Sequence, residues 1–143
     1  MTDHLLRVAL AGPSSQLARC EDASWAIRKF AVLCEDWPSK VRRLRDSGIS
    51  DAILSPTERI VAKRECERGI REAHVVLWLA GGSEGASWEC GFADALGKPI
   101  VVAGKPRHPI YGETIEDSLR FDDDATAIAY LRGIAERRMR GAA

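Results

Sequence analysis

The sequence has no excess of charge of either sign. Its 143 residues include 21 Lys and Arg and 21 Asp and Glu, so the formal net charge is zero. Proteins that bind a nucleic-acid polymer or an anionic membrane surface usually rely on clustered positive charge. The composition therefore argues against both kinds of partner.

Long apolar runs are also missing. The longest, such as Val75 to Ala80 and Pro99 to Ala103, are far shorter than the roughly 20 residues that a membrane-spanning helix needs. The first residues lack the basic, apolar and small-residue regions of a secretory signal. We therefore expect a cytoplasmic protein that does not insert into a membrane.

Several cofactor signatures are absent as well. No CxxC pair and no Cys/His cluster with the spacing of zinc ligands occurs, so we expect reduced cysteines and no metal site. Neither GxxxxGK[ST] nor GxGxxG is found, which argues against an ATPase and a classical NAD enzyme. The sequence predicts no cofactor. The four cysteines are Cys20, Cys34, Cys66 and Cys90.

What the sequence does contain is an alternation of two patterns. Short apolar runs predict buried strands, and apolar residues that recur every three or four positions predict amphipathic helices. Strands are expected at Leu5 to Ala11, Ala52 to Leu54, His74 to Ala80, Pro99 to Ala103 and Leu119 to Phe121. Helices are expected within Asp22 to Gly48, from Thr57 to Ala73, from Ala86 to Leu96, and around Ile128 to Met139.

This alternation predicts an α/β protein. Buried strands without polar alternation are typical of an open parallel sheet with helices on both faces, and residues 1–143 should form one such domain. Right-handed crossovers favour the flavodoxin-like, Rossmann-like strand order 2-1-3-4-5, in which ligands bind where strands one and three diverge. The loops Gly12-Pro13-Ser14 and Gly81 to Glu89 should therefore face one cleft.

Glu89 is the candidate catalytic residue. The predicted helix begins after Gly85, so Glu89 lies in its first turn, where unpaired N–H groups and the helix dipole favour the ionised form. A charged carboxylate beside small residues can attack an anomeric carbon and form a glycosyl ester. The structural alternative is an acid that only stabilises the helix, although a reciprocal capping box would need Ser or Thr in place of Ala86.

The loop that precedes this carboxylate is rich in small and hydroxylated residues. Gly82 and Gly85 let the backbone approach a ligand, and Ser83 and Ser87 offer hydroxyl groups, which suits phosphate or sugar oxygens. Trp88 is a candidate to pack beneath a sugar or base, with a core position as the alternative. An ordinary surface loop has a similar composition.

Three segments share their order and spacing with a known family. They read Leu10-Ala11-Gly12-Pro13, Ala73-His74-Val75-Val76 and Ser83-Glu84-Gly85-Ala86-Ser87-Trp88-Glu89-Cys90-Gly91-Phe92-Ala93-Asp94-Ala95-Leu96-Gly97-Lys98-Pro99-Ile100. This pattern resembles the nucleoside 2-deoxyribosyltransferase family, with its LAGP strand end, Ala-Asp-Val strand start and Gly-Thr-x-x-Glu-x-Gly-x-Ala helix ending in Gly-Lys-Pro. The resemblance implies that Glu89 is the nucleophile that takes up the ribosyl or deoxyribosyl group, and that the protein is a homo-oligomer.

Two departures from the family pattern bear on substrate and mechanism. Ser83 stands where the base-exchanging transferases have Asp, and so resembles the branch that hydrolyses nucleoside 5′-monophosphates; a hydroxyl can donate to a phosphate that a carboxylate would repel. Cys66 stands where the family has the acid that assists the leaving base. Glu65, Glu67 and Glu84 are the other candidates for that proton donor, each with a solvated surface glutamate as the alternative.

The sequence thus predicts cleavage of the N-glycosidic bond of a nucleoside or nucleoside 5′-monophosphate, with hydrolysis or transfer to another base. Two alternatives stay open: a module that binds a nucleotide or sugar phosphate without turnover, and a phosphoribohydrolase that releases cytokinin bases. The motif of the latter, PGGxGTxxE, is one residue shorter and starts with Pro where this chain has Ala80. Substrate contacts are expected from Gly12, Pro13, Ser14, Gly82, Ser83, Gly85, Ser87 and Trp88.

Overall fold

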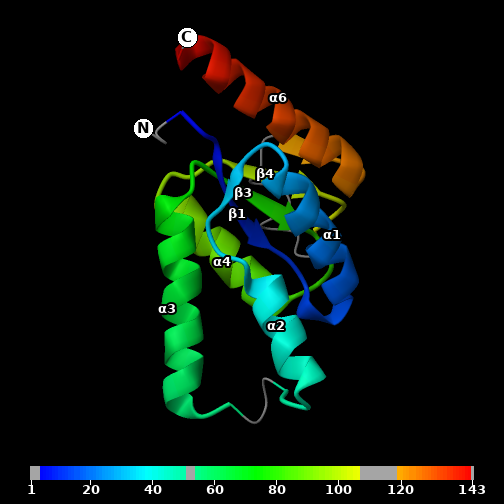
Figure 1. Cartoon of the computed structure of the whole chain (residues 1–143), viewed down its shortest axis with the longest axis vertical. Helices are drawn as coiled ribbons and strands as arrows, with labels where there is room; N and C mark the ends of the chain where they lie inside the picture. Colours follow the sequence, from blue (N-terminus) through cyan, green and yellow to red (C-terminus); the bar gives the residue numbers. More distant parts are fainter. Residues whose placement is uncertain (1–3, 51–53, 107–118, 143) are drawn as a thin grey trace.

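The computed structural model describes residues 4–50, 54–106 and 119–142. Within them, five strands form one sheet in the order β2-β1-β3-β4-β5 (Figure 1). Every neighbouring pair of strands runs parallel. The α/β class and the predicted strand order 2-1-3-4-5 are therefore confirmed.

The strands are short and the helices vary in length. The strands are β1 (Arg7–Ala11), β2 (Val32–Leu33), β3 (Val75–Leu79), β4 (Ile100–Ala103) and β5 (Arg120–Phe121). The helices are α1 (Leu17–Arg28), α2 (Trp37–Asp46), α3 (Pro56–Glu72), α4 (Glu84–Ala95) and α6 (Asp124–Ala142), and a 3-10 turn at Ser14–Gln16 precedes α1.

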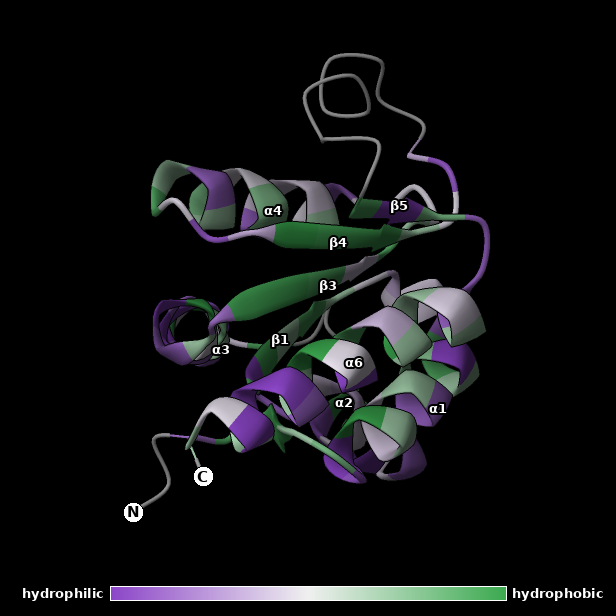
Figure 2. Ribbon diagram, turned by 90° about the horizontal axis from the view of Figure 1, so that it is seen from above, coloured by the Kyte–Doolittle hydropathy of each residue, from purple (hydrophilic) through white to green (hydrophobic). Residues whose placement is uncertain are grey.

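The central strands feed two separate cores because successive side chains point to opposite faces of a sheet. In β1, Val8 and Leu10 belong to the core beneath α1 and α6, whereas Ala9 and Ala11 belong to the core beneath α3 and α4. Trp78 fills the second core beside these small alanines and is buried. Figure 2 shows the apolar β3 and β4 between the helices of the two faces.

The second strand differs from the prediction. Leu54 lies in a bend, the other two residues of the predicted strand lie outside the described residues, and the strand beside β1 is Val32–Leu33. This segment was predicted to be helical because Phe30 and Cys34 continue a four-residue spacing. A strand of two residues is too short to show a periodicity of its own, so pairing with β1 decides its conformation.

Helix α3 begins slightly earlier than predicted. Its N-cap is Ser55 rather than Thr57, and Pro56 occupies the first turn. The Ser55 hydroxyl accepts a hydrogen bond from the Glu58 N–H at 3.2 Å, and the Glu58 carboxylate accepts one from the Ser55 N–H at 2.6 Å. This reciprocal capping box fixes the start of the helix that later forms one wall of the candidate site.

Arg19 links α1 to α6 and to the ends of β3 and β4. Its Nε and Nη2 donate to the two oxygens of Asp124 at 2.7 Å each, and Nη1 donates to Gln16 Oε1 at 3.0 Å. The carbonyls of Ala80 and Ala103 accept from Nη1 and Nη2 at 2.8 and 3.3 Å. All five N–H donors of the guanidinium are thus used.

We expect Arg19→Met to destabilise the fold strongly. The substitution leaves the Asp124 carboxylate and the Ala80 carbonyl without a donor, whereas the Ala103 carbonyl keeps the Ala80 N–H, and this should cost about 2–4 kcal/mol of the free energy of unfolding. Arg42→Met is the matched control, because Arg42 forms a similar two-bond contact with Glu21 at the surface. Its loss should lower the free energy of unfolding much less, because solvent screens this surface pair. Urea denaturation measures both, and equal losses would contradict the role assigned to Arg19.

Candidate active site

A cleft of about 590 Å³ opens at the carboxyl ends of β1 and β3. Gly12 and Ser14 line it from the loop after β1, and Ser83, Gly85 and Ala86 line it from the loop and first turn after β3. This is the place in the sheet where the sequence predicts a ligand site. The remaining lining residues are Trp37, Val41, Leu54, Arg59, Ala62, Cys66 and Glu89.

Glu89 lines the cleft from the second turn of α4. The helix begins at Glu84, earlier than the predicted Ala86, because Ser83 is its N-cap. The Ser83 hydroxyl accepts a hydrogen bond from the Ala86 N–H at 3.2 Å. Glu89 therefore lies beyond the unpaired N–H groups of the helix start, and its predicted place in the first turn is wrong.

The environment of Glu89 favours the neutral carboxyl. Burial raises its pKa to about 7, and a hydrogen bond with the Cys66 side chain offsets part of that rise. Among the described residues, no Lys or Arg forms an ion pair with Glu89. The expectation that the helix dipole holds this group ionised is therefore also wrong, and both protonation states are populated near neutral pH.

Cys66 faces Glu89 from α3. Burial is the main reason that the pKa of its thiol rises to about 12, and the nearby Glu89 carboxylate raises it further. The thiol therefore stays protonated at neutral pH and can act as a hydrogen-bond donor to Glu89. Cys66 does not have the chemistry of the carboxylic acid that stands at this position in the family it resembles.

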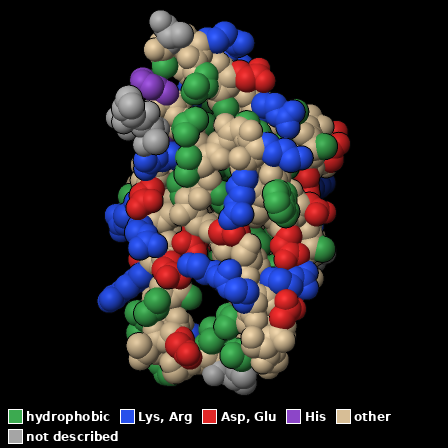
Figure 3. Space-filling view, in the orientation of Figure 1, with side chains coloured by type: hydrophobic (Ala, Val, Ile, Leu, Met, Phe, Trp, Pro, Cys, Tyr) green, Lys and Arg blue, Asp and Glu red, His purple; other side chains and the backbone are tan. Residues whose placement is uncertain are grey.

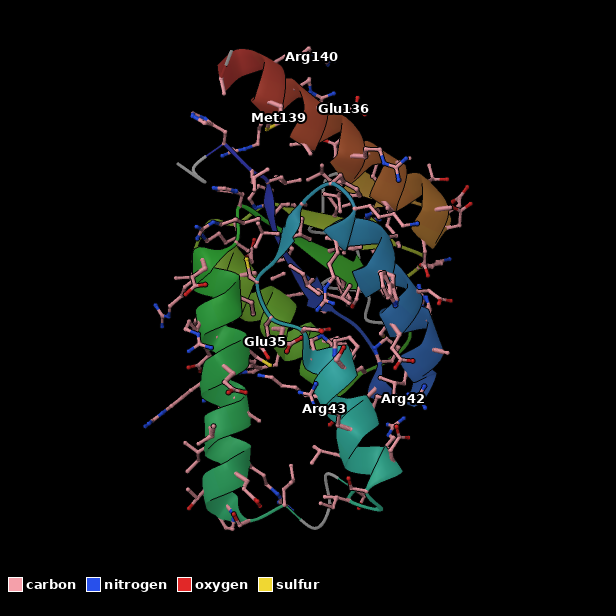
Figure 4. All side chains as sticks on the ribbon, viewed as in Figure 1. Glu35, Arg42, Arg43, Glu136, Met139 and Arg140 are labelled. Atoms are coloured by element: carbon pink, nitrogen blue, oxygen red, sulfur yellow. The ribbon has the colours of Figure 1, made fainter. Side chains whose placement is uncertain are left out.

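Glu35 is a buried carboxylate beside the cleft that the sequence did not predict. It lies two residues after the end of β2, is only 8% exposed, and borders a small void together with Cys66 and Glu89. Lys40 Nζ lies 2.6 Å from Glu35 Oε1 and 2.8 Å from Glu65 Oε2. Figure 4 shows Glu35 between α3 and the start of α2. The signal for it, a carboxylate at the end of a strand, was hidden because β2 was predicted to be part of a helix.

The predicted contact residues divide into two groups. Gly12, Ser14, Ser83 and Gly85 line the cleft with Glu89. Pro13, in contrast, is buried beneath the loop, where its carbonyl accepts a hydrogen bond from the Gln16 N–H at 2.9 Å.

Gly82, Ser87 and Trp88 are not among the residues that line this cleft. The Ser87 hydroxyl donates to the Ser83 carbonyl at 3.1 Å. Trp88 is 45% exposed on the outer side of α4, where it stacks on Phe92 and has the Lys63 ammonium 5.2 Å from its ring centroid. Trp88 therefore occupies neither the core nor the wall of the cleft.

The three candidate proton donors also lie in different places. Glu65 pairs with Lys40 in a groove next to the cleft. Glu67 pairs with Lys63 at 3.4 Å, and Glu84 is exposed in the first turn of α4. Of the three, only Glu65 lines the groove that adjoins the cleft of Glu89.

The part of the chain that the structure describes contains no group of three His, Cys, Asp or Glu side chains placed to bind a metal ion. All four cysteines are free thiols. None of the helices in the described ranges has the length and apolar character needed to cross a bilayer.

Comparison with known proteins finds no matching family model and no matching curated protein. Among solved structures, the chain is similar to the CMP N-glycosidase BcmB of Clostridium botulinum. The two are 19% identical, the match covers 87% of this chain and 96% of that chain, and the TM-score is 0.45.

We expect Glu89→Gln to stabilise the protein at alkaline pH. The pKa of Glu89 in the folded state, about 7, exceeds the value of an unfolded chain, so the folded state loses stability as pH rises from about 4 to 7. Removing the charge should raise the free energy of unfolding by about 2 kcal/mol at pH 8 and change it little at pH 4.5.

Urea denaturation at both pH values measures this difference. Glu67→Gln is the control, because Glu67 lies at the surface of α3 and pairs with Lys63. Its effect on stability should be small at both pH values. If Glu89→Gln were no more stable than the wild type at pH 8, the carboxyl group would not be held in a poorly solvated site.

Proposed function

We propose that this protein cleaves the N-glycosidic bond of a nucleoside or nucleoside 5′-monophosphate, with Glu89 as the nucleophile. The observation that carries the proposal is the position of Glu89 in a cleft at the switch point of the sheet, without a cationic partner among the described residues. The sequence pattern around Gly12 and from Ser83 to Ile100 supports the same chemistry.

The reaction proceeds in two steps. The ionised carboxylate of Glu89 attacks C1′ of the sugar while the bond between C1′ and the base nitrogen breaks. The bonding electrons leave with the base, which takes up a proton from solvent. Water then attacks C1′ of the glycosyl ester, releases a proton to solvent and regenerates the carboxylate and the free sugar. Attack by a second base instead of water gives transfer.

The phosphate of a 5′-monophosphate would bind near the start of α4. The Ser83 oxygen accepts a hydrogen bond from the Ala86 N–H, which leaves the hydroxyl hydrogen able to donate to a phosphate oxygen. Arg59 lines the same cleft and contributes positive charge. We therefore expect the protein to prefer a 5′-monophosphate over the corresponding nucleoside.

The rate should depend on the ionised form of Glu89. Below pH 7, kcat/KM should rise about tenfold per pH unit, and above pH 7 it should level off, because a protonated carboxyl group is not a nucleophile. Glu89→Gln should fold but release no base at any pH. Chromatography of a panel of nucleosides and 5′-monophosphates, with and without an acceptor base, measures the release.

Two results would overturn the role of Glu89. A rate that falls above pH 7 would indicate that this group acts as a proton donor instead. Undiminished release of base by Glu89→Gln would remove it from the mechanism altogether.

Ser83→Asp should shift the preference toward unphosphorylated nucleosides. Asp caps a helix as well as Ser does, so α4 should keep its start, while the added charge repels a phosphate dianion. We expect the ratio of kcat/KM for a 5′-monophosphate to that for its nucleoside to fall by about tenfold or more. Ser55→Asp, at the N-cap of α3, is the control. An unchanged ratio in Ser83→Asp would argue against phosphate at this position.

Binding without turnover is the second candidate function. It is favoured by Cys66, which stands where the family that this sequence resembles has its acid. The thiol has a pKa of about 12 and is therefore a much weaker proton donor than a carboxylic acid. This candidate predicts calorimetric binding of a nucleotide with no free base after long incubation. Formation of free base in a burst would eliminate it.

A further inference from the structure

A second groove continues the cleft between α2 and α3. It encloses about 550 Å³, and Figure 3 shows the surface hollowed between these helices. A ligand that reaches Glu89 in the cleft can therefore extend past Cys66 into this groove. The residues that line both spaces are Trp37, Val41, Leu54, Ala62 and Cys66.

Five charged side chains line this groove, and three of them, Glu35, Lys40 and Glu65, form one connected cluster. Lys40 bridges Glu35 and Glu65, with its Nζ 2.6 and 2.8 Å from one oxygen of each. Burial opposes the charge on Lys40, but its hydrogen bonds to both carboxylates outweigh that effect and raise its pKa. The trio Glu35–Lys40–Glu65 thus combines two carboxylates with one ammonium group.

Both carboxylates of the trio retain capacity for a ligand. Within the described ranges, Lys40 is the only side-chain hydrogen-bonding partner of Glu35 and of Glu65. Each carboxylate therefore has a second oxygen that can accept a hydrogen bond, and Lys40 has a third N–H. Either carboxylate together with Lys40 presents an acceptor beside a donor, which favours a ligand edge in which an N–H donor adjoins an acceptor.

The trio is anchored by Glu35, its buried member, while Lys40 and Glu65 are partly exposed. Glu35 is buried, and α3 approaches it closely because residue 69 is glycine: a Cβ on Gly69 would lie 2.8 Å from the Glu35 Cβ. Trp37, which borders both spaces, is fixed by the hydrogen bond from its Nε1 to the Leu10 carbonyl at 2.8 Å. The groove is therefore formed before a ligand binds.

We propose that the trio Glu35–Lys40–Glu65 recognises the nucleobase of the substrate and selects 6-aminopurines and 4-aminopyrimidines, such as adenine and cytosine. The inference rests on the proposed function, because a sugar with C1′ at Glu89 and its phosphate toward Ser83 directs the base past Cys66. The amino group of adenine or cytosine donates to a carboxylate, and the adjacent ring nitrogen accepts from Lys40. In hypoxanthine and uracil, the carbonyl and ring N–H reverse this order of donors and acceptors.

Kinetics with matched substrates tests the proposal. The wild type should favour cytidine over uridine and adenosine over inosine, as nucleosides or 5′-monophosphates, by about tenfold or more in kcat/KM. Glu35→Gln and Lys40→Met should reduce this preference to less than about threefold. Lys63→Met is the matched control, because Lys63 also pairs with a glutamate on α3 but does not line the groove, and its preference should be unchanged.

Binding of free bases separates this proposal from the proposed function. Calorimetry with cytosine, uracil, adenine and hypoxanthine should show tighter binding of the amino base of each pair to the wild type and to Glu89→Gln, and loss of the difference in Glu35→Gln. Lys40→Met leaves the buried Glu35 carboxylate without its cation, so this variant could fail to fold. If thermal melting shows that Lys40→Met is unfolded, Glu65→Gln is used in its place.

The outcomes are distinct. Binding with the amino preference but without turnover would support the base site and contradict the N-glycosidase function. Turnover with equal rates for the paired substrates, or a preference that Glu35→Gln leaves unchanged, would overturn the base site and leave the N-glycosidase function standing. Equal binding of the paired bases, or no saturable binding of any base together with no preference in turnover, would also overturn it.

Discussion

The parallel pairing of β1 with β3 is the interaction on which the rest of the structure depends. Four residue pairs, from Val8 with Val75 to Ala11 with Trp78, fix the register of the two strands, so both end at the same edge of the sheet. After β1 the chain continues to α1 on one face, and after β3 it continues to α4 on the other. The two connections diverge, and the space between them is the cleft that holds Glu89.

The candidate site combines a polar group that is costly to bury with a frame that holds it in place. Glu89 has a raised pKa and lacks a cation among the described residues, so the folded state gains no stability from its charge. Arg19, whose five donors bind Gln16, α6 and the ends of β3 and β4, stabilises the same edge of the sheet. At this one edge of the sheet, Arg19 thus stabilises the fold, whereas Glu89 is the reactive group.

The strongest sequence patterns led to correct structural predictions. The apolar runs at β1, β3 and β4 are fully or nearly fully buried, and predicting these strands required no knowledge of the tertiary contacts. Val32–Leu33 was missed because two residues carry no pattern and only pairing with β1 makes them a strand. Glu35 was missed for the same reason, since its place beside Glu89 follows from the end of β2. Trp88 shows the opposite error. It was expected in the cleft because it precedes Glu89 in the sequence, but neighbouring residues of a helix point in different directions, and Trp88 is exposed outside the cleft.

By itself, the sequence determined the fold class, the strand order and the loops that face the cleft. These properties follow from local hydrophobic patterns and from the handedness of parallel connections, both of which are encoded in short segments. Only the tertiary structure decided that Glu89 is poorly solvated and that Glu35, Lys40 and Glu65 form one cluster. The physical reason is that solvation and ion pairing depend on which distant segments meet, and residues 35, 40, 65 and 89 come from the end of β2 and from three different helices.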